Sequence, residues 1–336
     1  MAALAGIIGT KPFPPPAACR LCGAAGATVI GTRDRTGKAL RTVICPGCGL
    51  VWTDPPLANA RDYYRDDYRK AYKGTYAPKA KHVLRAGQVA LSRYAAMRDF
   101  LPAPGGGGDV SILDIGAGGG EFIYLLHTLG YAVKGLEPNR GYAEYAIREY
   151  GLDLDVGFVQ DADASSGTFR FVTLWHVLEH LEDPVAALGK IHSLLDPEGV
   201  LIVEVPNVEA VCQSPAGTFH EAHLFYFNSA TLRELLLASG FRILSERVSG
   251  DGGNLFLAAR KAPPDAPSRR AAEIRGNAER IAAVVLAHTP LRHYLTARPY
   301  VRFYRRLCRS LGEKWAVRRF PGGKALLDGL YSRAAR

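Results

Sequence analysis

Four of the six cysteines form two closely spaced pairs near the N-terminus. Cys19 and Cys22 make the first pair, and Cys45 and Cys48 the second, each with two residues between them. Such a pair can place two thiolates on one side of a tight turn, and each pair continues into a glycine that eases the turn. Four thiolates at this spacing are typical of a closed tetrahedral zinc site. We therefore predict a structural Zn²⁺ ion held by these four residues.

Two disulfide bonds are the alternative for these cysteines. The N-terminal segment lacks the basic stretch that opens a secretion signal, so we expect a cytoplasmic protein, in which disulfides are rare. Cys212 and Cys308 stand alone in the sequence and are expected to pack as small apolar side chains. No apolar run reaches the ~20 residues that cross a bilayer.

A glycine-rich turn interrupts the segment SILDIGAGGGEFIYLL, residues 111–126. The residues before the glycines predict a strand and those after them a helix, so the turn can approach a ligand closely. A P-loop requires a lysine after the last glycine, and none follows here. A dinucleotide motif requires a small residue where this sequence has Glu121, whose charge would repel a pyrophosphate. The turn therefore favours a ligand that presents no phosphate to it.

Strand and helix patterns alternate from this turn onward, which predicts a parallel sheet covered by helices on both faces. The predicted strands are residues 110–115, 131–137, 154–159, 169–175 and 200–205, followed by a hairpin of 242–248 and 254–260. We expect a seven-stranded α/β sheet with an antiparallel final strand. The predicted organisation is a zinc-ribbon-like module (1–55), a helical lid or linker (56–108), the α/β domain (109–260) and a basic helical extension (261–336).

Several motifs in this order resemble class I S-adenosylmethionine-dependent methyltransferases over residues 109–260. The glycine turn resembles the first motif of that superfamily, and Glu137 stands 23 residues after Asp114, at the end of the second strand. The segments LWHVLEHLEDP and DPEGVLIVEVPN resemble its fourth and fifth strands. The resemblance implies a Rossmann-like fold that binds S-adenosylmethionine. The candidate cofactor residues are Asp114, Gly116, Ala117, Gly118, Gly120, Glu137, Pro138, Asp161, Ala162, Trp175 and His176.

The resemblance also implies roles for some of these residues. Glu137 would bind the ribose hydroxyls, the alternative being a helix N-terminal charge before Pro138. Asp161 or the backbone of Ala162 would meet the adenine amino group, unless this segment is a simple surface turn. Trp175 and the histidine after it would line the pocket.

Within the superfamily, the chain looks like bacterial sugar C-methyltransferases with an N-terminal zinc module. The shared features are the cysteine pairs, a following aromatic segment, the residues His220 to Asn228, and Gly252-Gly253-Asn254-Leu255. That group has a further C-terminal α/β domain, whereas this chain ends in a short basic tail, so O-methylation is equally expected. Glu179-His180 resembles a metal-binding group of ubiquinone-pathway O-methyltransferases, but position 175 is Trp instead of Glu, and we assign no metal there.

Most of the candidate catalytic residues follow the fifth strand, and His180 follows the fourth. Methyl transfer needs a positioned acceptor and often a base, and His223 is the first candidate because imidazole titrates near neutral pH. Glu221 or His220 would orient it, Tyr226 would bind the acceptor, and His180 is a second possible base. The alternative is that His223 only caps a helix or bonds to the backbone.

Four tyrosines recur every fourth residue after the zinc module, at Tyr64, Tyr68, Tyr72 and Tyr76. On a helix they form one stripe. The stripe predicts either the packed face of a half-buried helix or a lid whose hydroxyls reach the substrate.

The net charge of +10 is concentrated at one end of the chain. Residues 261–336 hold 17 Lys and Arg against 5 Asp and Glu, which leaves 25 against 27 for residues 1–260. Residues 281–320 alternate apolar groups with arginines, as amphipathic helices do. We expect that this segment either has a solvated basic face or docks to a partner. The partner would be a protein or the anionic inner face of a membrane.

The predicted acceptor is a small molecule, most simply a sugar, a glycan or a secondary metabolite. An RNA methyltransferase with a zinc ribbon is the competing class, and the basic tail would suit phosphates. The loop after the fifth strand reads Val-Pro-Asn instead of an amino-group motif of the Asn/Asp-Pro-Pro-Tyr type, which disfavours nucleic acid. A cofactor-binding scaffold without catalysis is the third interpretation.

Overall fold

The structure of the 336-residue chain is a computed structural model. It describes residues 14–57, 60–62, 65, 78–104, 110–162, 167–263 and 271–332. The tyrosine stripe predicted from Tyr64 to Tyr76 lies outside these ranges, as does Asp109, the predicted first residue of the α/β domain.

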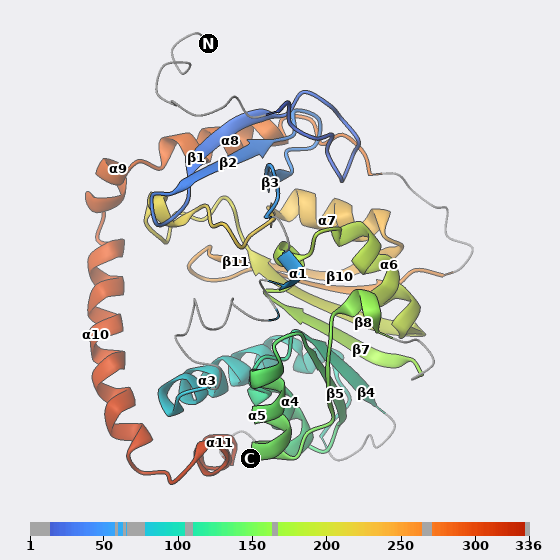
Figure 1. Ribbon diagram of the computed structural model, residues 1–336, viewed down its shortest axis with the longest axis vertical. Coiled ribbons are helices and arrows are strands. Elements are labelled where there is room, and N and C mark those ends of the chain that lie inside the picture. The colour runs from blue at the N-terminus through green and yellow to red at the C-terminus, as the bar shows by residue number, and fades with distance from the viewer. Residues whose placement is uncertain are drawn as a thin grey trace.

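A mixed seven-stranded sheet forms the centre of the described chain (Figure 1). Its strand order is β10-β11-β8-β7-β4-β5-β6. Neighbours from β8 to β6 pair in parallel, whereas β11 is antiparallel to both β8 and β10. The strands are β4 (Ser111–Ile115), β5 (Ala132–Glu137), β6 (Leu154–Val156), β7 (Phe169–Trp175), β8 (Leu195–Pro206), β10 (Phe241–Val248) and β11 (Asn254–Lys261). This confirms the predicted α/β fold with an antiparallel final strand.

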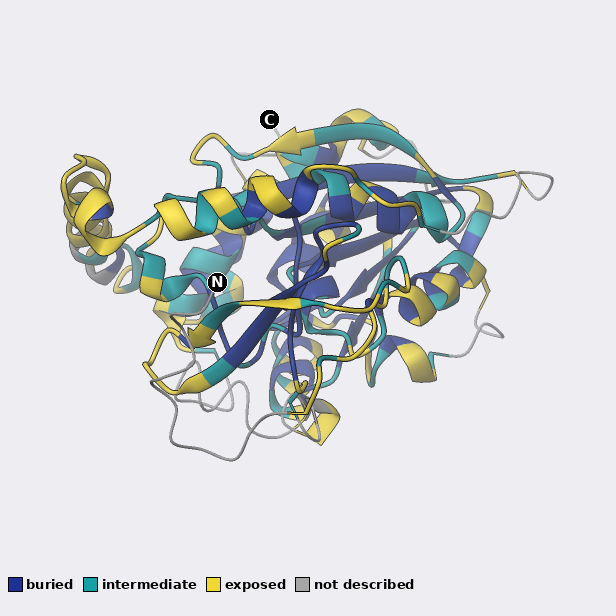
Figure 2. Ribbon diagram, turned by 90° about the horizontal axis from the view of Figure 1, so that it is seen from above, coloured by how far each residue is buried: buried dark blue, intermediate teal, exposed yellow. Residues whose placement is uncertain are grey.

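Helices cover both faces of this sheet because successive residues of a buried strand point to opposite faces. Ile112 and Phe256 pack in a core with α3, α4, α5 and α11, whereas Leu113 and Leu257 pack in another core with α6 and α7. Figure 2 shows the central strands buried between these layers. The helices are α3 (Ala80–Met97), α4 (Glu121–Thr128), α5 (Arg140–Tyr150), α6 (Pro184–Leu194), α7 (Ser229–Ala238) and α11 (Gly323–Tyr331).

The third parallel strand is shorter than the predicted range 154–159. It ends at Val156, and Gly157 leads into a 3₁₀ turn, η3 (Val159–Asp161). Asp161 and Ala162 therefore lie at the end of this turn, beyond the carboxyl end of β6.

A second sheet joins the N-terminal segment to a distant part of the chain. Its strands are β1 (Thr28–Arg33), β2 (Ala39–Ile44), β3 (Val51–Thr53) and β9 (Phe225–Tyr226), in that order. The last of these comes from the segment between β8 and α7. Thr53 strengthens the junction, since its N–H donates to Leu224 O at 3.0 Å and its hydroxyl donates to His223 O at 2.9 Å. The N-terminal sheet thus holds the segment that carries the candidate base.

The C-terminal residues form helices that return to both ends of the molecule (Figure 1). These are α8 (Asn277–Ala287), α9 (Pro290–Tyr294), α10 (Arg298–Val317) and α11. The Asn277 side chain donates to Cys48 O at 2.8 Å, which fixes the start of α8 to the second cysteine pair. At the other end, the Tyr331 hydroxyl donates to Glu121 O at 2.8 Å and fixes α11 to α4.

Among the residues that the structure describes, no helix has both the length and the apolar character that a membrane span needs.

Candidate active site

A cavity of about 740 Å³ opens at the carboxyl ends of β4, β5, β7 and β8. Its other walls come from α3 and from the segment between β8 and β9, which contributes His220 and His223. In open parallel sheets, ligands bind outside the carboxyl ends of the strands. The size suits a nucleoside cofactor together with a small second molecule.

The glycine turn and Glu137 build one end of this cavity. Gly116 has a φ of +77°, and a Cβ atom there would lie 2.5 Å from Val177 Cγ2, so the turn requires glycine at this position. The Glu137 carboxylate is buried and accepts hydrogen bonds from Gly118 N at 2.7 Å and from Asn139 N at 3.0 Å. Two backbone donors thus hold this acid at the cavity wall.

Seven of the eleven predicted cofactor residues line the cavity. They are Gly116, Ala117, Gly118, Glu137, Pro138, Trp175 and His176. Gly120 ends the same glycine turn and is the N-cap of α4, with a φ of +82°. Asp114 lies beneath the turn, where its carboxylate accepts a hydrogen bond from the Thr173 hydroxyl at 2.5 Å. Burial raises the pKa of Asp114 to about 7.

Asp161 and Ala162 do not line the cavity either, although their neighbours Phe158, Val159 and Gln160 do. The Asp161 carboxylate forms an ion pair with Arg61, whose guanidinium lies 4.6 Å from the centre of the Phe158 ring. Sequence reasoning missed Phe158. The predicted strand 154–159 included Phe158, whereas β6 ends at Val156, so the sequence pattern hid this residue within a strand.

His176 stands at the end of β7 with a left-handed backbone, φ +58°. This conformation places its ring between two acids: Nδ1 lies 3.3 Å from Glu179 Oε1, and Nε2 lies 3.2 Å from Glu204 Oε1. Burial alone would lower the pKa of His176, but these carboxylates outweigh it and raise the pKa to about 9. His176 therefore carries a positive charge at neutral pH, and Glu204 joins the site without having been predicted.

Glu179 is the most deeply buried acid of the site, with 1% of its surface exposed. Burial alone would raise its pKa, but the charges of His180 and His176 outweigh it and lower the pKa to about 2. Within the described chain neither carboxylate oxygen has a hydrogen bond of normal geometry. His180 Nε2 lies 3.7 Å from Glu179 Oε1, while His180 Nδ1 bonds to Ala222 O at 2.8 Å. A carbonyl only accepts, so His180 Nδ1 carries a proton and donates it to Ala222 O.

His223 lies beside this acid and faces the same cavity. Its ring centre is 4.8 Å from that of His180 and 5.2 Å from that of His220. Burial, followed by the charge of His180, lowers the pKa of His223 to about 3. The imidazole is therefore neutral at physiological pH and has a lone pair to offer.

Tyr226 and His220 shape the turn that carries His223. The Tyr226 hydroxyl accepts from His220 N and donates to His220 O, both at 2.9 Å. His220 Nδ1 accepts from Ala222 N at 2.9 Å. Glu221 does not line the cavity, so the structure brings His180, His220, His223 and Tyr226 together and leaves Glu221 apart.

Among the residues that the structure describes, two groups of side chains could hold a metal ion. Glu179, His180 and His223 have ligand atoms within 4.8 Å of one another, as do the four paired cysteines.

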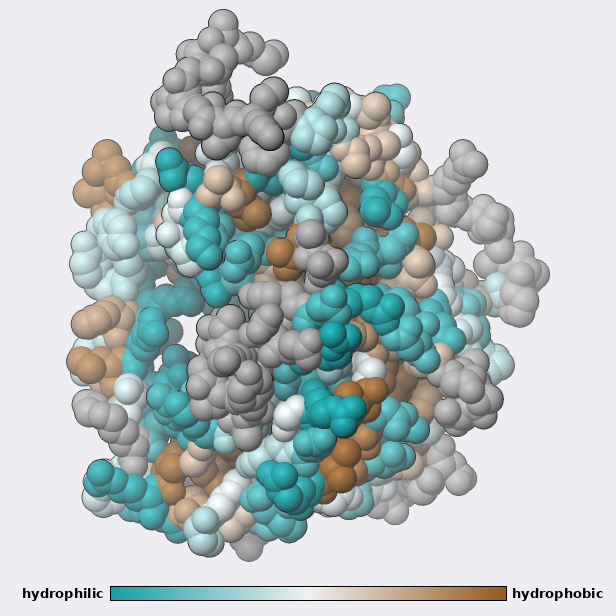
Figure 3. Space-filling view, in the orientation of Figure 1, coloured by the Kyte–Doolittle hydropathy of each residue, from teal (hydrophilic) through white to brown (hydrophobic). Residues whose placement is uncertain are grey.

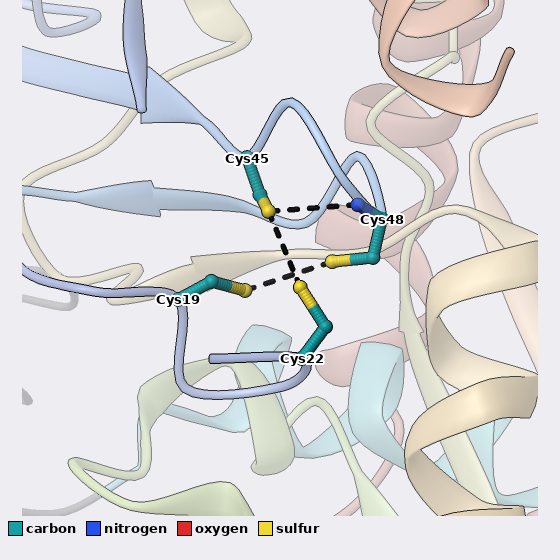
Figure 4. A group of neighbouring side chains, drawn as sticks. All are labelled: Cys19, Cys22, Cys45 and Cys48. Carbon is teal, nitrogen blue, oxygen red and sulfur yellow. Dashed lines mark hydrogen bonds between the residues drawn. The ribbon is translucent and has the colours of Figure 1, made fainter. Parts of the chain in front are cut away.

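In the cysteine group, Sγ atoms of Cys19 and Cys48 lie 3.6 Å apart, and those of Cys22 and Cys45 lie 3.5 Å apart (Figure 4). Zinc–sulfur bonds of ~2.3 Å in a tetrahedron place sulfur atoms about 3.8 Å apart. The four cysteines are free thiols, and their spacing suits a tetrahedral ion.

Fold and site together define a class of protein. The strand order, the glycine turn after the first parallel strand and the acid after the second have the arrangement expected for class I methyltransferases. Residues 81–246 match a family model described as a methyltransferase domain. This part of the chain is a class I S-adenosylmethionine-dependent methyltransferase domain, and the family predicted from the motifs is confirmed.

Similarity to characterised proteins covers part of the chain. C-methyltransferase NovU of Streptomyces niveus is 27% identical over 160 residues, which span 46% of this chain and 38% of that protein. A ubiquinone biosynthesis O-methyltransferase of Caulobacter vibrioides is 32% identical over 148 residues, which span 40% of this chain and 56% of that protein. The match therefore covers less than two thirds of either relative. Among solved structures, magnesium protoporphyrin IX methyltransferase of Synechocystis PCC 6803 with bound SAH covers 60% of this chain and 98% of its own at 19% identity, with a TM-score of 0.48.

Proposed function

We propose that this protein transfers the methyl group of S-adenosylmethionine to a hydroxyl or carbon of a small acceptor, such as a sugar, a glycan or a secondary metabolite. One observation carries the proposal: the same cavity joins Glu137 and the glycine turn to the histidines His176, His180 and His223. A cavity of about 740 Å³ holds a cofactor and a small acceptor side by side. The similarity to a C-methyltransferase and to O-methyltransferases supports both kinds of methylated atom.

The cofactor half of the cavity consists of the glycine turn, Glu137 and Phe158. Without side chains, Gly116 and Gly118 let the backbone approach the amino-acid part of the cofactor. The Glu137 carboxylate is placed to accept the two ribose hydroxyls, and Phe158 offers an apolar wall for the adenine. When bound, the cofactor supplies an electrophilic methyl group. All further chemistry falls to the acceptor half.

The acceptor half holds a base beside a fixed negative charge. His223 is neutral and can take the proton of an acceptor hydroxyl, and the ionised Glu179 then stabilises the imidazolium that forms. A pKa of about 3 makes His223 alone a weak base. The His180 ring centre lies 4.8 Å from that of His223, so both imidazoles can reach the same acceptor, and we assign the proton transfer to the pair.

A divalent cation is the second candidate for the acceptor half. The observation that favours it is the buried Glu179 carboxylate, which has no regular hydrogen bond within the described chain and lies within 4.8 Å of ring nitrogens of His180 and His223. Such a cation would be held by Glu179, His180 and His223 and would orient an acceptor oxygen.

We also propose that Cys19, Cys22, Cys45 and Cys48 hold one Zn²⁺ ion. All four positions are thiolates, so the ion is closed to substrates and its role is structural. Because β3 pairs with β9, an ordered zinc module also holds the turn that carries His223 in place.

The test is turnover of the His223→Ala variant, measured by S-adenosylhomocysteine release with panels of sugar, glycan, secondary-metabolite and RNA acceptors. Base catalysis is worth ~10²–10⁴-fold, and we expect a loss of that size with unchanged cofactor affinity. His127→Ala, which removes an exposed histidine from α4, is the matched control. Loss of turnover on adding EDTA, with zinc content unchanged, would assign the acceptor half to a cation. Turnover on RNA alone, or cofactor binding without turnover on any acceptor, would overturn the small-molecule proposal.

A further inference from the structure

Helix α10 separates its apolar and charged residues onto opposite faces. Tyr300, Phe303, Tyr304, Leu307 and Trp315 recur at intervals of three, four or eight residues and so share one face. The arginines at 298, 302, 305 and 309 fall on the other face. A helix with this pattern normally buries its apolar face in the protein core.

In this structure the charged face is the one that contacts the protein. Glu313 is 4% exposed and accepts two hydrogen bonds of 2.6 Å from the Arg85 guanidinium on α3. Three turns earlier, Arg302 donates to Cys212 O at 2.9 Å. Both contacts lie on the charged face, so the apolar face points away from the protein.

The aromatic side chains of α10 are accordingly exposed to solvent. Phe303 is 70% exposed, Tyr304 and Trp315 are each 67% exposed, and Tyr300 is 62% exposed. The stretch just before this helix adds Leu291 and Leu295, at 72% and 77%. Figures 2 and 3 show this region at the left edge, exposed along most of its length and with separate hydrophobic groups among paler ones. An apolar surface of this extent marks an interaction site.

The charge around this surface indicates what it binds. Residues 290–320 contain nine Arg and Lys and a single acidic residue, Glu313, which is already paired with Arg85. At the border of the apolar stripe, the exposed Arg319 guanidinium lies 4.7 Å from the centre of the Trp315 ring. An apolar stripe with a cation at its border suits a partner that is apolar inside and anionic outside, as a bilayer with anionic lipids is. Trp and Tyr also favour the membrane–water interface. A second copy of this helix would instead bring like charges together.

We propose that α10 docks on an anionic membrane surface, with its aromatic face in the headgroup region and its charged face toward the protein. The cavity would then lie close to the lipid. Arg85 lines the cavity, and Cys212 stands between the lining residues Ala210 and Gln213, so both contacts of α10 lie at the cavity wall. If the proposed function holds, this geometry favours acceptors attached to a lipid; the docking itself does not depend on catalysis.

Co-sedimentation of the full chain with vesicles tests the docking. We expect binding to phosphatidylcholine vesicles that contain about 30% phosphatidylglycerol, at least about tenfold weaker binding to phosphatidylcholine alone, and weakening by salt. Phe303→Ser combined with Trp315→Ser should lose binding while keeping the circular dichroism and melting temperature of the wild type. Arg140→Gln, which removes an exposed charge from α5, is the control and should bind normally.

Tryptophan fluorescence gives an independent readout of the same contact. The chain has three tryptophans, and Trp52 and Trp175 are only 6% and 5% exposed, so a blue shift on adding anionic vesicles reports Trp315. Trp315→Phe should abolish the shift and retain sedimentation. Equal binding of the wild type and the double-serine variant would overturn the proposal. So would a dimer that the double-serine substitution converts to monomer, since the stripe would then pair two copies.

Discussion

The two halves of the cavity are built in different ways. The cofactor half comes from one continuous stretch, in which Gly116 and Glu137 follow neighbouring parallel strands. The acceptor half combines the end of β7 with the turn before β9, and Thr53 of the N-terminal sheet holds that turn through two hydrogen bonds. A local site tolerates changes elsewhere in the chain, whereas an assembled site depends on every segment that supports it. Variants that damage one half should therefore spare the other.

The cysteine cluster offers the strongest test of this separation. Zinc binding contributes ~10–16 kcal/mol to the folding of small zinc modules. Removing one thiolate should therefore release the ion and disorder β3. We expect Cys45→Ser to contain much less than the about one zinc per chain predicted for the wild type and to melt at a lower temperature. Because β3 pairs with β9, turnover should fall sharply. Cofactor affinity, measured by calorimetry, should change little.

Cys308→Ser is the matched control for this experiment. Cys308 was expected to pack as a small apolar side chain, but it is an exposed thiol on α10. The variant should keep zinc, melting temperature and turnover. Full zinc content in Cys45→Ser would exclude the metal site, and an equal loss of cofactor binding would show that the two halves are coupled.

The reverse experiment removes an acid from the cofactor half. Glu137→Ala deletes a charged hydrogen-bond acceptor and should weaken S-adenosylmethionine binding by ~1.5–3 kcal/mol. It also frees Gly118 N, which Glu137 binds at 2.7 Å, so Glu137→Gln should show a smaller loss. Glu144→Gln, an exposed acid on α5, serves as control. Calorimetric affinity equal to that of the wild type would contradict the ribose role.

The difference between a local and an assembled site also explains how well the sequence predicted each half of the cavity. Glu137 could be predicted as a cofactor residue because its position after the second strand is set by local spacing, and its carboxylate accepts a hydrogen bond from Gly118 N at 2.7 Å. Glu204 and Phe158 were missed, since only the pairing of β7 with β8 and the short turn after β6 bring them to the cavity. Glu221 was chosen because it belongs to the same short segment as His223, but it does not line the cavity. The strand β9 is only two residues long, so the sequence contains no local pattern that would predict its pairing with the N-terminal sheet.

Acid pH should destabilise the acceptor half first. The pKa values of His223 and His220, about 3 and about 4, lie below the 6.5 of an unperturbed histidine. The unfolded chain therefore binds more protons than the native one between pH 6.5 and about 4, and the free energy of unfolding falls as the pH drops through that window. Since His223 keeps some contact with the solvent of the cavity, we expect about 1–2 kcal/mol from it.

Denaturant titrations of the wild type and of His223→Gln at pH 7 and pH 4.5 measure this contribution. The variant should lose less stability than the wild type over that interval. Parallel losses would mean that His223 is accessible enough to protonate in the folded protein, which would place it outside the enclosed pair with His180.

The smallest expected effect separates the two roles open to Tyr226. Its hydroxyl bonds to both backbone groups of His220, which indicates that it positions the turn rather than the acceptor. Tyr226→Phe removes two hydrogen bonds beside a cavity from which water can replace them, so we expect a loss of about 1 kcal/mol in stability. A positioning role predicts a several-fold lower kcat with KM for the acceptor unchanged, because the base moves while the binding surface stays. An acceptor-binding role predicts the opposite: a raised KM at constant kcat. Tyr294→Phe, an exposed tyrosine on α9, controls for loss of a hydroxyl, and cofactor affinity should stay constant in both variants because neither residue touches the cofactor half.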